Sequence, residues 1–406
     1  MRILMIAPEP FLEPRGTPFS VYHRIQALIA LGHEVDLVTY PFGRTVKIPG
    51  LTIHRSPAPP FVQRVKIGPS LAKFPLDLLL FFTAIKRLSR KRYYYLHTHE
   101  EASIMGTLLA RIFGCKHLYD MHSDLSQQLS NFAFTRNQLL IRWAAAIQRW
   151  AIRHADVIIT ICADLKESVE KIAPGKPVYL IENAAVDEFL PPASEQQIAA
   201  LRRRLNPGNV PVLLYTGTLE SYQGIDLLLH SAVIVRKELK ELPGIRYVLV
   251  GGHPEQVKEY RRLAAKLGIA DIVHFTGQRP LEEMPQYTAL ADILLSPRSE
   301  GTNTPLKLYT YLRSGKPILA TNIASHTQLL THDIAMLVAP TAEGLAQGTL
   351  ALLRNPEQAR VLGMRGKAKA DEHYSWPAFL EKHRQAYEQF IGQVKVVSAR
   401  RNTCAV

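Results

Sequence analysis

Short apolar runs alternate with longer amphipathic segments along most of this chain, and the alternation predicts its secondary structure. Wholly apolar runs are typical of strands that are buried on both faces of a parallel sheet. We expect strands at 2–6, 33–40, 117–119, 157–161 and 178–181, with a helix at 19–31. The alternation restarts after residue 209 and predicts strands at 212–215, 247–250, 272–275, 293–296 and 318–320. The pattern therefore predicts an α/β fold of two doubly wound, Rossmann-like domains.

The length of 406 residues also favours two domains. The turn-rich stretch 191–209 is the expected boundary, which gives an N-terminal domain over 1–195 and a C-terminal domain over 210–375. Ligands of doubly wound sheets bind beyond the carboxyl ends of the strands. We therefore expect the functional site in the cleft between the two domains.

Composition narrows the class of protein. Hydrophobic residues make up 47% of the chain and charged residues 21%, which is ordinary for a globular protein. Cys115, Cys162 and Cys404 are far apart in sequence, which is typical of a reducing compartment and argues against structural zinc. No apolar run reaches the ~20 residues that span a bilayer. The apolar stretch at the N-terminus is too short to be a signal peptide. The sequence predicts a cytoplasmic protein.

The formal net charge of +14 raises the question of an anionic partner. Nucleic acid is not expected, because the chain has no nucleic-acid-binding motif. An anionic membrane is a better candidate, since the apolar segment Leu71–Leu88 leads into a cationic cluster. That cluster consists of Lys86, Arg87, Arg90, Lys91 and Arg92. The alternative is a buried helix with a solvated basic end, and the sequence leaves both interpretations open.

Two nucleotide-binding motifs are missing. No GxGxxG follows the first strand and no GxxxxGK[ST] occurs, which disfavours dinucleotide oxidoreductases and P-loop NTPases. Gly16 and Thr17 stand just before the first predicted helix, where backbone amides can approach a phosphate or a sugar. A plain tight turn explains Gly16 about as well.

Several short motifs occur in a characteristic order. Residues 32–35 read GHEV, residues 119–124 read YDMHSD, and residues 181–189 read IENAAVDEF. In the second half, residues 216–219 read TGTL, residues 251–252 are GG, and residues 296–309 read SPRSEGTNTPLKLY. Along nearly its full length the chain resembles the retaining GT-B glycosyltransferases of family 4.

The resemblance implies a hexosyltransferase-type enzyme whose two domains face a central cleft. Its donor would be a nucleotide-diphosphate sugar, and its acceptor a hydroxyl of a glycan, a glycolipid or a lipid-linked molecule, with no metal required. A last helix at 376–391 would cross back to the first domain, followed by a disordered tail at 392–406. The location would be cytoplasmic, with a peripheral position on the inner face of the membrane as a further option.

The same resemblance assigns residues to the site. It implies that His122 hydrogen-bonds the donor sugar and that Glu300 contacts the transferred sugar. Thr218 or Leu219 replaces the family's diphosphate-binding Arg here, Gln223 replaces its Lys, and Thr310 replaces its ribose-binding glutamate. Arg279, Arg298 and Lys307 are the candidate substitutes for the missing charge, because guanidinium–phosphate pairs are strong. The predicted donor-binding residues are Gly16, Thr17, Gly217, Thr218, Gln223, Gly252, Arg279, Arg298, Gly301, Thr302, Asn303, Thr304, Lys307 and Thr310.

Other functions stay open at this point. The missing Arg, Lys and Glu make a non-catalytic GT-B scaffold or partner subunit an alternative. A sugar-nucleotide epimerase is a weaker one, because no acid–base carboxylate pair stands out. The run from His97 to Glu101 resembles a metal site, but alternate residues at a strand end make a poor closed cage. We expect these side chains to have an acceptor-side or structural role.

Overall fold

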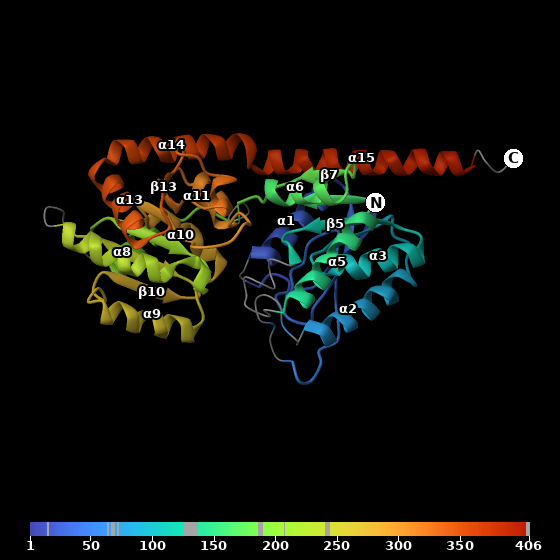
Figure 1. Ribbon diagram of the computed structural model, residues 1–406, viewed down its shortest axis with the longest axis horizontal. Helices are drawn as coiled ribbons and strands as arrows, with labels where there is room; N and C mark the ends of the chain where they lie inside the picture. The colour runs from blue at the N-terminus through green and yellow to red at the C-terminus, as the bar shows by residue number, and fades with distance from the viewer. Residues whose placement is uncertain are drawn as a thin grey trace. The chain divides into compact units, whose positions relative to one another are not determined.

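The chain forms two compact units in a computed structural model, one of residues Met1–Asn183 with Trp376–Val406 and one of residues Ala184–Ser375 (Figure 1). The structure describes residues 1–13, 16–62, 65, 70, 73–125, 137–185, 190–206, 208–239 and 244–402, with side chains as far as residue 390. Residues 71–72, 186–189 and 403–406, which the sequence analysis used, lie outside the described residues.

Unit 1 is built on a parallel seven-stranded sheet in the order β3-β2-β1-β4-β5-β6-β7. Its strands are β1 (Arg2–Ala7), β2 (Glu34–Thr39), β3 (Leu51–Arg55), β4 (Tyr95–His99), β5 (Lys116–Met121), β6 (Val157–Thr160) and β7 (Val178–Leu180). Its helices are α1 (Gly16–Ala30), α2 (Lys73–Leu88), α3 (Ala102–Phe113), α5 (Gln138–His154), α6 (Ala163–Ile172) and α15 (Trp376–Asn402).

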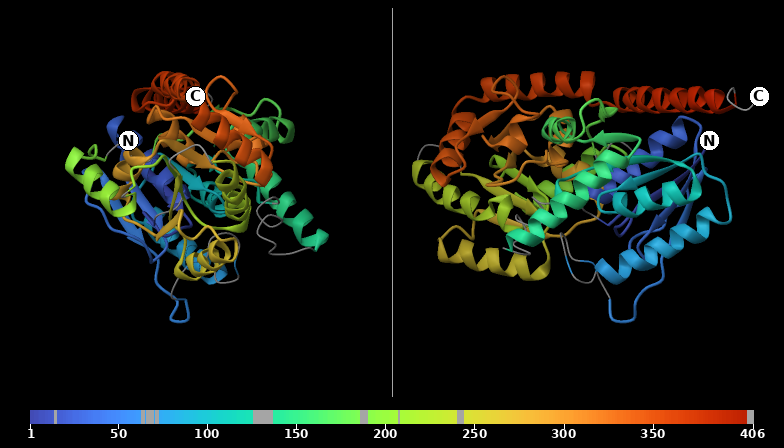
Figure 2. Two further views of the ribbon diagram at one scale, coloured as in Figure 1. Left: turned by 90° about the vertical axis from the view of Figure 1, so that its left-hand side faces the viewer. Right: turned by 45° about the vertical axis from the view of Figure 1, so that its right-hand side comes forward.

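The two faces of this sheet carry different helices. Right-handed crossovers place α2, α3, α5 and α6 on one face, where neighbouring helices pack in that order (Figures 1 and 2). Leu4, Ile6 and Leu96 point to that face and form a core with Leu80 of α2 and Leu109 of α3. Helices α1 and α15 pack against one another on the other face. Because side chains alternate along a strand, the odd-numbered residues of β4 point toward α1 and α15.

Unit 2 has a parallel six-stranded sheet in the order β10-β9-β8-β11-β12-β13. Its strands are β8 (Val212–Thr216), β9 (Arg246–Val250), β10 (Val273–Gly277), β11 (Ile293–Ser296), β12 (Ile318–Thr321) and β13 (Met336–Val338). Its helices are α7 (Glu195–Leu205), α8 (Ile225–Glu238), α9 (Pro254–Lys266), α10 (Met284–Leu290), α11 (Lys307–Arg313), α12 (Ala324–Thr327), α13 (Ala342–Arg354) and α14 (Pro356–His373). One apolar core lies under α8, α9 and α13, and a second under α7, α10, α11 and α14.

The structure confirms the α/β class with two doubly wound sheets and corrects several details. Helix α1 begins three residues earlier than expected, because Pro18 lies in the first turn, where a backbone N–H has no partner in the helix. The stretch expected to be a turn-rich boundary contains helix α7, which begins at the capping box of Ser194 and Gln197. Helix α15 continues to Asn402, beyond the expected end at 391.

Strands β3 and β13 were not expected from the sequence. β3 is an edge strand with a half-exposed face and produces no continuous apolar run. β13 has only three residues and lies within the apolar run 334–339, which was not interpreted as a strand. In the described part of the chain, no helix is both long and apolar enough to cross a membrane.

Candidate functional site

The central pair of strands in unit 2, β8 and β11, marks one candidate site. From β8 the chain proceeds to one side of the sheet and from β11 to the other, so their carboxyl ends border the crevice where doubly wound folds bind ligands. The loop after β8 runs from Gly217 to Gly224, and the loop after β11 runs from Pro297 to Leu306.

Glycine allows these two loops to pack backbone against backbone. Gly224 has a left-handed φ of 69°, and a Cβ on it would lie 1.9 Å from the carbonyl oxygen of Pro297. The Ser299 amide donates to the carbonyl of Tyr222 across the same contact at 3.0 Å. The loops therefore hold one another in place, and any side chain at Gly224 would separate them.

Two basic side chains converge in this crevice. The Lys307 ammonium lies 3.8 Å from the ring centre of Tyr215 and 3.4 Å from the Gln223 side-chain oxygen. The Arg298 guanidinium lies 4.9 Å from the ring centre of Tyr222, and its Nη1 donates to the Asn303 carbonyl at 2.7 Å. These contacts aim both cations at the carboxyl ends of β8 and β11.

The charges of this pair are not neutralised by acidic side chains. Throughout the described residues, no carboxylate forms an ion pair with Arg298 or Lys307, and Arg298 Nε has no hydrogen-bond partner. Burial and the nearby Arg298 lower the pKa of Lys307 well below its usual value, and burial lowers the pKa of Arg298. Two partly buried cations without a counter-charge are suited to binding an anionic ligand.

The structure brings most of the predicted donor-binding residues to this crevice. Gly217 and Thr218 follow β8, and a Cβ on Gly217 would lie 3.5 Å from Lys307 Nζ. A Cβ on Gly301 would lie 2.8 Å from Arg298 Nη2, so glycine leaves room for the guanidinium. Gly252 follows β9 and packs against Leu219.

The remaining unit 2 residues differ in exposure. Glu300 is exposed, Thr302 and Asn303 are half-buried, and Thr304 and Thr310 are buried. Arg279 follows β10, the edge strand, and the structure does not bring it to Arg298 and Lys307. Helix α11 has only seven residues, so its dipole is small and the side-chain cations are the main source of positive charge.

A second candidate site, within unit 1, is a buried cluster at the carboxyl ends of β4 and β5. His97 and His99 alternate along β4, and Asp120 and His122 alternate along β5 and just beyond it, so all four point to the face covered by α1 and α15. Asp120 accepts from His97 Nε2 at 3.3 Å and lies 3.1 Å from His122 Nε2. Arg24 of α1 donates to the same carboxylate at 2.8 Å.

Arg24 determines the charge state of this cluster. Burial opposes ionisation of Asp120, but Arg24 and then His122 outweigh it and hold the pKa of Asp120 well below its usual value. Burial lowers the pKa of His97 and of His99, which keeps both neutral. Asp120 is thus an ionised carboxylate paired with the Arg24 guanidinium.

His97, His99 and Asp120 are also close enough to suggest a metal centre, with ligand atoms within 4.8 Å of one another. The Arg24 guanidinium, however, already occupies the Asp120 carboxylate on which a cation would depend. The donor set therefore does not fit a divalent metal, and we derive no chemistry through one.

Glu100 follows β4 in a left-handed conformation, with a φ of 48°, which is uncommon for a residue other than glycine. Its carboxylate accepts from the Ser123 hydroxyl at 2.7 Å. Burial raises the pKa of Glu100 to about 7. Gly16 and Thr17 begin α1, at the carboxyl end of β1, and a Cβ on Gly16 would meet nothing within 4 Å.

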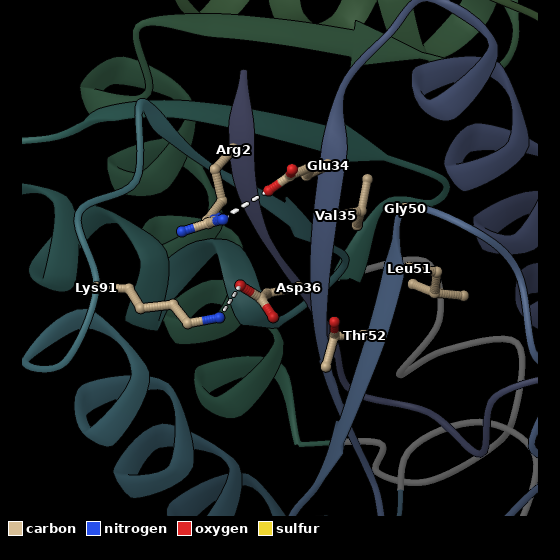
Figure 3. A pocket seen from close by; sticks show the side chains of 8 residues that line it. All are labelled: Arg2, Glu34, Val35, Asp36, Gly50, Leu51, Thr52 and Lys91. Carbon is tan, nitrogen blue, oxygen red and sulfur yellow. Dashed lines mark hydrogen bonds and ion pairs between the residues drawn. The ribbon is translucent and has the colours of Figure 1, made fainter.

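The five cations after the apolar segment do not share one environment. Lys86, Arg90 and Arg92 are exposed, whereas Arg87 is half-buried. Lys91 lies 3.6 Å from Asp36, in a pocket of about 280 Å³ at the amino ends of β1, β2 and β3 (Figure 3). That pocket lies at the edge of the sheet opposite to the carboxyl ends of the strands.

Sequence reasoning missed three residues of the unit 1 cluster, Arg24, His383 and Tyr387. All three are fully buried, and the last two come from α15. His383 contacts Arg24, 359 residues away, and Tyr387 contacts His97, 290 residues away. The only indication of these residues in the sequence was the presence of a polar side chain among the apolar positions of α1 and α15.

Two family models match the chain. One, described as glycosyl transferases group 1, matches residues 210–355, and the other, glycosyltransferase family 4, matches residues 14–188. An MMP alpha-(1->4)-mannosyltransferase of Mycolicibacterium hassiacum is 25% identical over 97% of this chain and 99% of its own. A GDP-mannose-dependent alpha-(1-6)-phosphatidylinositol monomannoside mannosyltransferase of Mycobacterium tuberculosis is 27% identical over 50% of this chain and 54% of its own.

Solved structures agree on the fold. Sucrose-phosphate synthase of Thermosynechococcus elongatus has a TM-score of 0.77 at 20% identity, covering 97% of this chain and 99% of that chain. Anabaena HepE in complex with UDP-glucose has a TM-score of 0.73 at 16% identity, covering 97% of this chain and 100% of that chain.

Proposed function

Because the chain belongs to glycosyltransferase family 4 and is a glycosyltransferase with the GT-B fold, we propose that its donor is a nucleoside-diphosphate sugar held by Arg298 and Lys307. The observation that carries the proposal is the pair of partly buried cations, without a carboxylate partner among the described residues, at the central crevice of unit 2. A diphosphate supplies the missing negative charge, and Arg298 Nε, which lacks a partner, supplies a free donor.

The proposed chemistry follows from this charge. The bond between the anomeric carbon and the diphosphate oxygen breaks through an oxocarbenium-like state, while the acceptor oxygen bonds to the same face of the sugar. Negative charge develops on the departing diphosphate, where the two cations stabilise it. A leaving-group oxygen takes the proton of the acceptor hydroxyl, and the anomeric configuration is retained. His122 would hydrogen-bond the donor sugar, and Glu300 would contact the transferred sugar.

A nucleoside diphosphate should raise the melting temperature of the protein without added metal. Either UDP or GDP should stabilise it, because a ligand at 100 times its Kd adds about 2.7 kcal/mol. We expect the increase to persist in a chelator, since Arg24 occupies the one carboxylate of the buried histidine cluster. Thermal melts with UDP, GDP and EDTA measure this directly.

A donor panel then separates this proposal from its alternatives. Incubation with UDP and GDP sugars should give transferred or hydrolysed sugar. Epimerised donor would indicate an epimerase, and no turnover of any donor would favour a non-catalytic scaffold. Binding that disappears with EDTA and returns with a divalent metal would overturn the metal-free proposal.

For the acceptor we propose a hydroxyl on a molecule at an anionic membrane surface. One face of α2 exposes an apolar row with side chains 69%, 56% and 56% accessible at Phe74, Leu78 and Phe82, and the row continues to Lys86. Helix α5 exposes Trp143 beside basic residues. Apolar side chains next to cations are suited to the surface of an anionic bilayer.

The position of these helices supports the same proposal. Helix α3 packs between α2 and α5, so exposed apolar side chains occur on three adjacent helices (Figures 1 and 2). Leu108 and Ile112 are the exposed members on α3. The mannosyltransferase of Mycobacterium tuberculosis described above acts on a phosphatidylinositol monomannoside, which is a precedent for a lipid acceptor.

Vesicle binding should depend on this face. Replacing Lys86, Arg90 and Arg92 with Glu should weaken binding to anionic vesicles by roughly 100-fold, since each cation contributes about 1 kcal/mol near the surface. Cosedimentation at increasing salt and anionic lipid fraction measures the effect.

Two further variants test the source of the binding. Changing Phe74, Leu78 and Phe82 to Ser should also release the protein, whereas Met364→Ser, an exposed apolar residue of unit 2, should not. A matched charge reversal of the exposed Lys258, Arg262 and Lys266 of α9 should have a smaller effect. Equal losses of vesicle binding from both charge reversals would indicate nonspecific electrostatic attraction and would exclude a membrane-binding surface on α2.

A further inference from the structure

We infer that the last helix, α15, positions His122 for sugar transfer through two hydrogen-bonded relays that meet at Asp120. Both relays lie within unit 1 and begin at α15 side chains, Tyr387 and His383. The inference rests on the proposed function, in which His122 contacts the donor sugar. Tyr387 and His383 would act only through other residues and would not contact a substrate.

The first relay starts at Tyr387. Its hydroxyl lies 2.7 Å from His97 Nδ1, and His97 Nε2 lies 3.3 Å from Asp120 Oδ2. Ionised Asp120 can only accept, so His97 carries its proton on Nε2 and its Nδ1 accepts from Tyr387. The Tyr387 hydroxyl therefore donates to the remaining ring nitrogen and supports the tautomer in which His97 donates to Asp120.

The second relay starts at His383. Its Nδ1 lies 2.7 Å from the carbonyl of Phe379 in the same helix, so Nδ1 carries the proton and Nε2 is the acceptor. Arg24 Nη1 donates to that Nε2 at 3.0 Å, and Arg24 Nε donates to Asp120 at 2.8 Å. A third contact, from Arg24 Nη2 to the Ile181 carbonyl at 2.8 Å, completes the orientation of the guanidinium.

The two relays occupy one carboxylate oxygen of Asp120 and leave the other oxygen to contact His122. Oδ2 receives Arg24 and His97, while Oδ1 lies 3.1 Å from His122 Nε2. This contact sets the orientation of the His122 ring and directs the N–H at Nε2 toward Asp120. His99 Nδ1 lies 3.3 Å from the same Nε2 and further limits movement of the ring.

A purely structural role does not explain these contacts well. Apolar residues stabilise a buried interface as well as or better than a buried ion pair does, because charges lose their hydration on burial. Here Arg24, Asp120 and the two α15 side chains are all fully buried, and both relays end at the Asp120 carboxylate, which contacts the ring of His122. Geometry of this kind is expected where a ring must be held at a fixed angle.

Tyr387→Phe is the decisive variant because it deletes a single hydroxyl. His97 then loses the donor that holds its tautomer, and we expect kcat for sugar transfer to fall roughly 10-fold or more. The KM for the donor and the Kd for UDP or GDP should stay unchanged, because unit 2 holds the diphosphate. Ring ¹⁵N shifts of labelled histidine should report a changed proton position at His97 or His122.

Tyr95→Phe is the matched control. Tyr95 lies in the same aromatic cluster, 5.6 Å from the Tyr387 ring, and its buried hydroxyl has no hydrogen-bond partner among the described residues. It should leave kcat and the histidine shifts as they are. An unchanged kcat in Tyr387→Phe, or an equal loss in both variants, would overturn the inference. If the wild-type protein transfers no sugar, the proposed function fails instead.

Discussion

Lys307→Met should weaken the binding of a nucleoside diphosphate by about 10- to 100-fold, since hydrogen bonds to charged groups contribute about 1.5–3 kcal/mol. The unliganded variant should be no less stable than the wild-type protein. Burial and Arg298 already disfavour the ammonium of Lys307, and no carboxylate in the described structure compensates for it. A loss of nucleoside diphosphate affinity without a loss of folding stability would identify Lys307 as a ligand-binding residue. Calorimetric titration and denaturant unfolding measure the two quantities.

The same lysine predicts the pH dependence of binding. A bound diphosphate favours the ammonium and therefore raises the pKa of Lys307, which is lowered in the free protein. Above the free-protein pKa, binding must take up a proton, so affinity should fall as pH rises. Measurements between about pH 8 and 10 avoid the phosphate ionisation near 6. Lys307→Met should lose this dependence.

Lys316 provides the control for Lys307. It is a second partly buried lysine of unit 2, and burial lowers its pKa. It precedes β12, at the amino end of the strand and away from the carboxyl ends that border the crevice, and it donates to the Ala291 carbonyl. Lys316→Met should bind nucleoside diphosphates like the wild type. A stable Lys307→Met protein with unchanged affinity would remove Lys307 from the donor site.

The unit 2 site was largely predictable from the sequence because its signals are local. The loop after β11 carries glycine, threonine and basic residues within one short segment, and the resemblance indicated where the usual diphosphate ligands are missing. Arg298 and Lys307 were nominated for that reason, and the structure places both in the crevice. Arg279 stood equally near a strand end, but only the strand order reveals that β10 is at the edge of the sheet.

The unit 1 cluster was predictable only in part because its contacts are long-range. His97 and His99 stand two residues apart on one strand, so a shared face followed from strand periodicity. Their partners did not follow, since nothing local to Arg24 or Tyr387 indicates that α1 and α15 cover that face. Elements with weak patterns were missed for a related reason, as with the half-exposed β3.

Buried histidines give the protein an unusual set of neutral groups. His117 Nε2 lies 2.7 Å from the Thr98 hydroxyl and its Nδ1 3.3 Å from the Thr107 hydroxyl. The Thr107 hydroxyl donates to Ser103, so His117 donates from Nδ1 and accepts at Nε2. A second proton on His117 would break the bond from Thr98. Burial accordingly lowers the pKa of His117 to about 3.

Other groups of unit 1 also change their pKa values on folding and so affect how many protons the folded state binds. Burial also lowers the pKa of His23 to about 3, and lowers those of His97, His99 and His383. The opposing groups are Glu100 and Asp77, whose pKa values burial raises to about 7. Near pH 5, folding removes protons from five histidines and adds protons to two carboxyls. The unfolded state of unit 1 therefore binds more protons than the folded state at this pH.

Stability of unit 1 should therefore fall as the pH decreases below about 6.5, the ordinary pKa of histidine. The sign follows from the lowered folded pKa values. The unfolded chain gains protons first, and the penalty from His117 and His23 grows until these two residues titrate near pH 3 in the folded state. His117→Gln keeps both hydrogen bonds but cannot titrate, so it should reduce the slope by about 1.4 kcal/mol per pH unit between about pH 5.5 and 4. His154→Gln, at an exposed site on α5, should leave the slope unchanged. Denaturant unfolding at closely spaced pH values measures these slopes, and equal slopes in wild type and His117→Gln would contradict the neutral, buried state of His117.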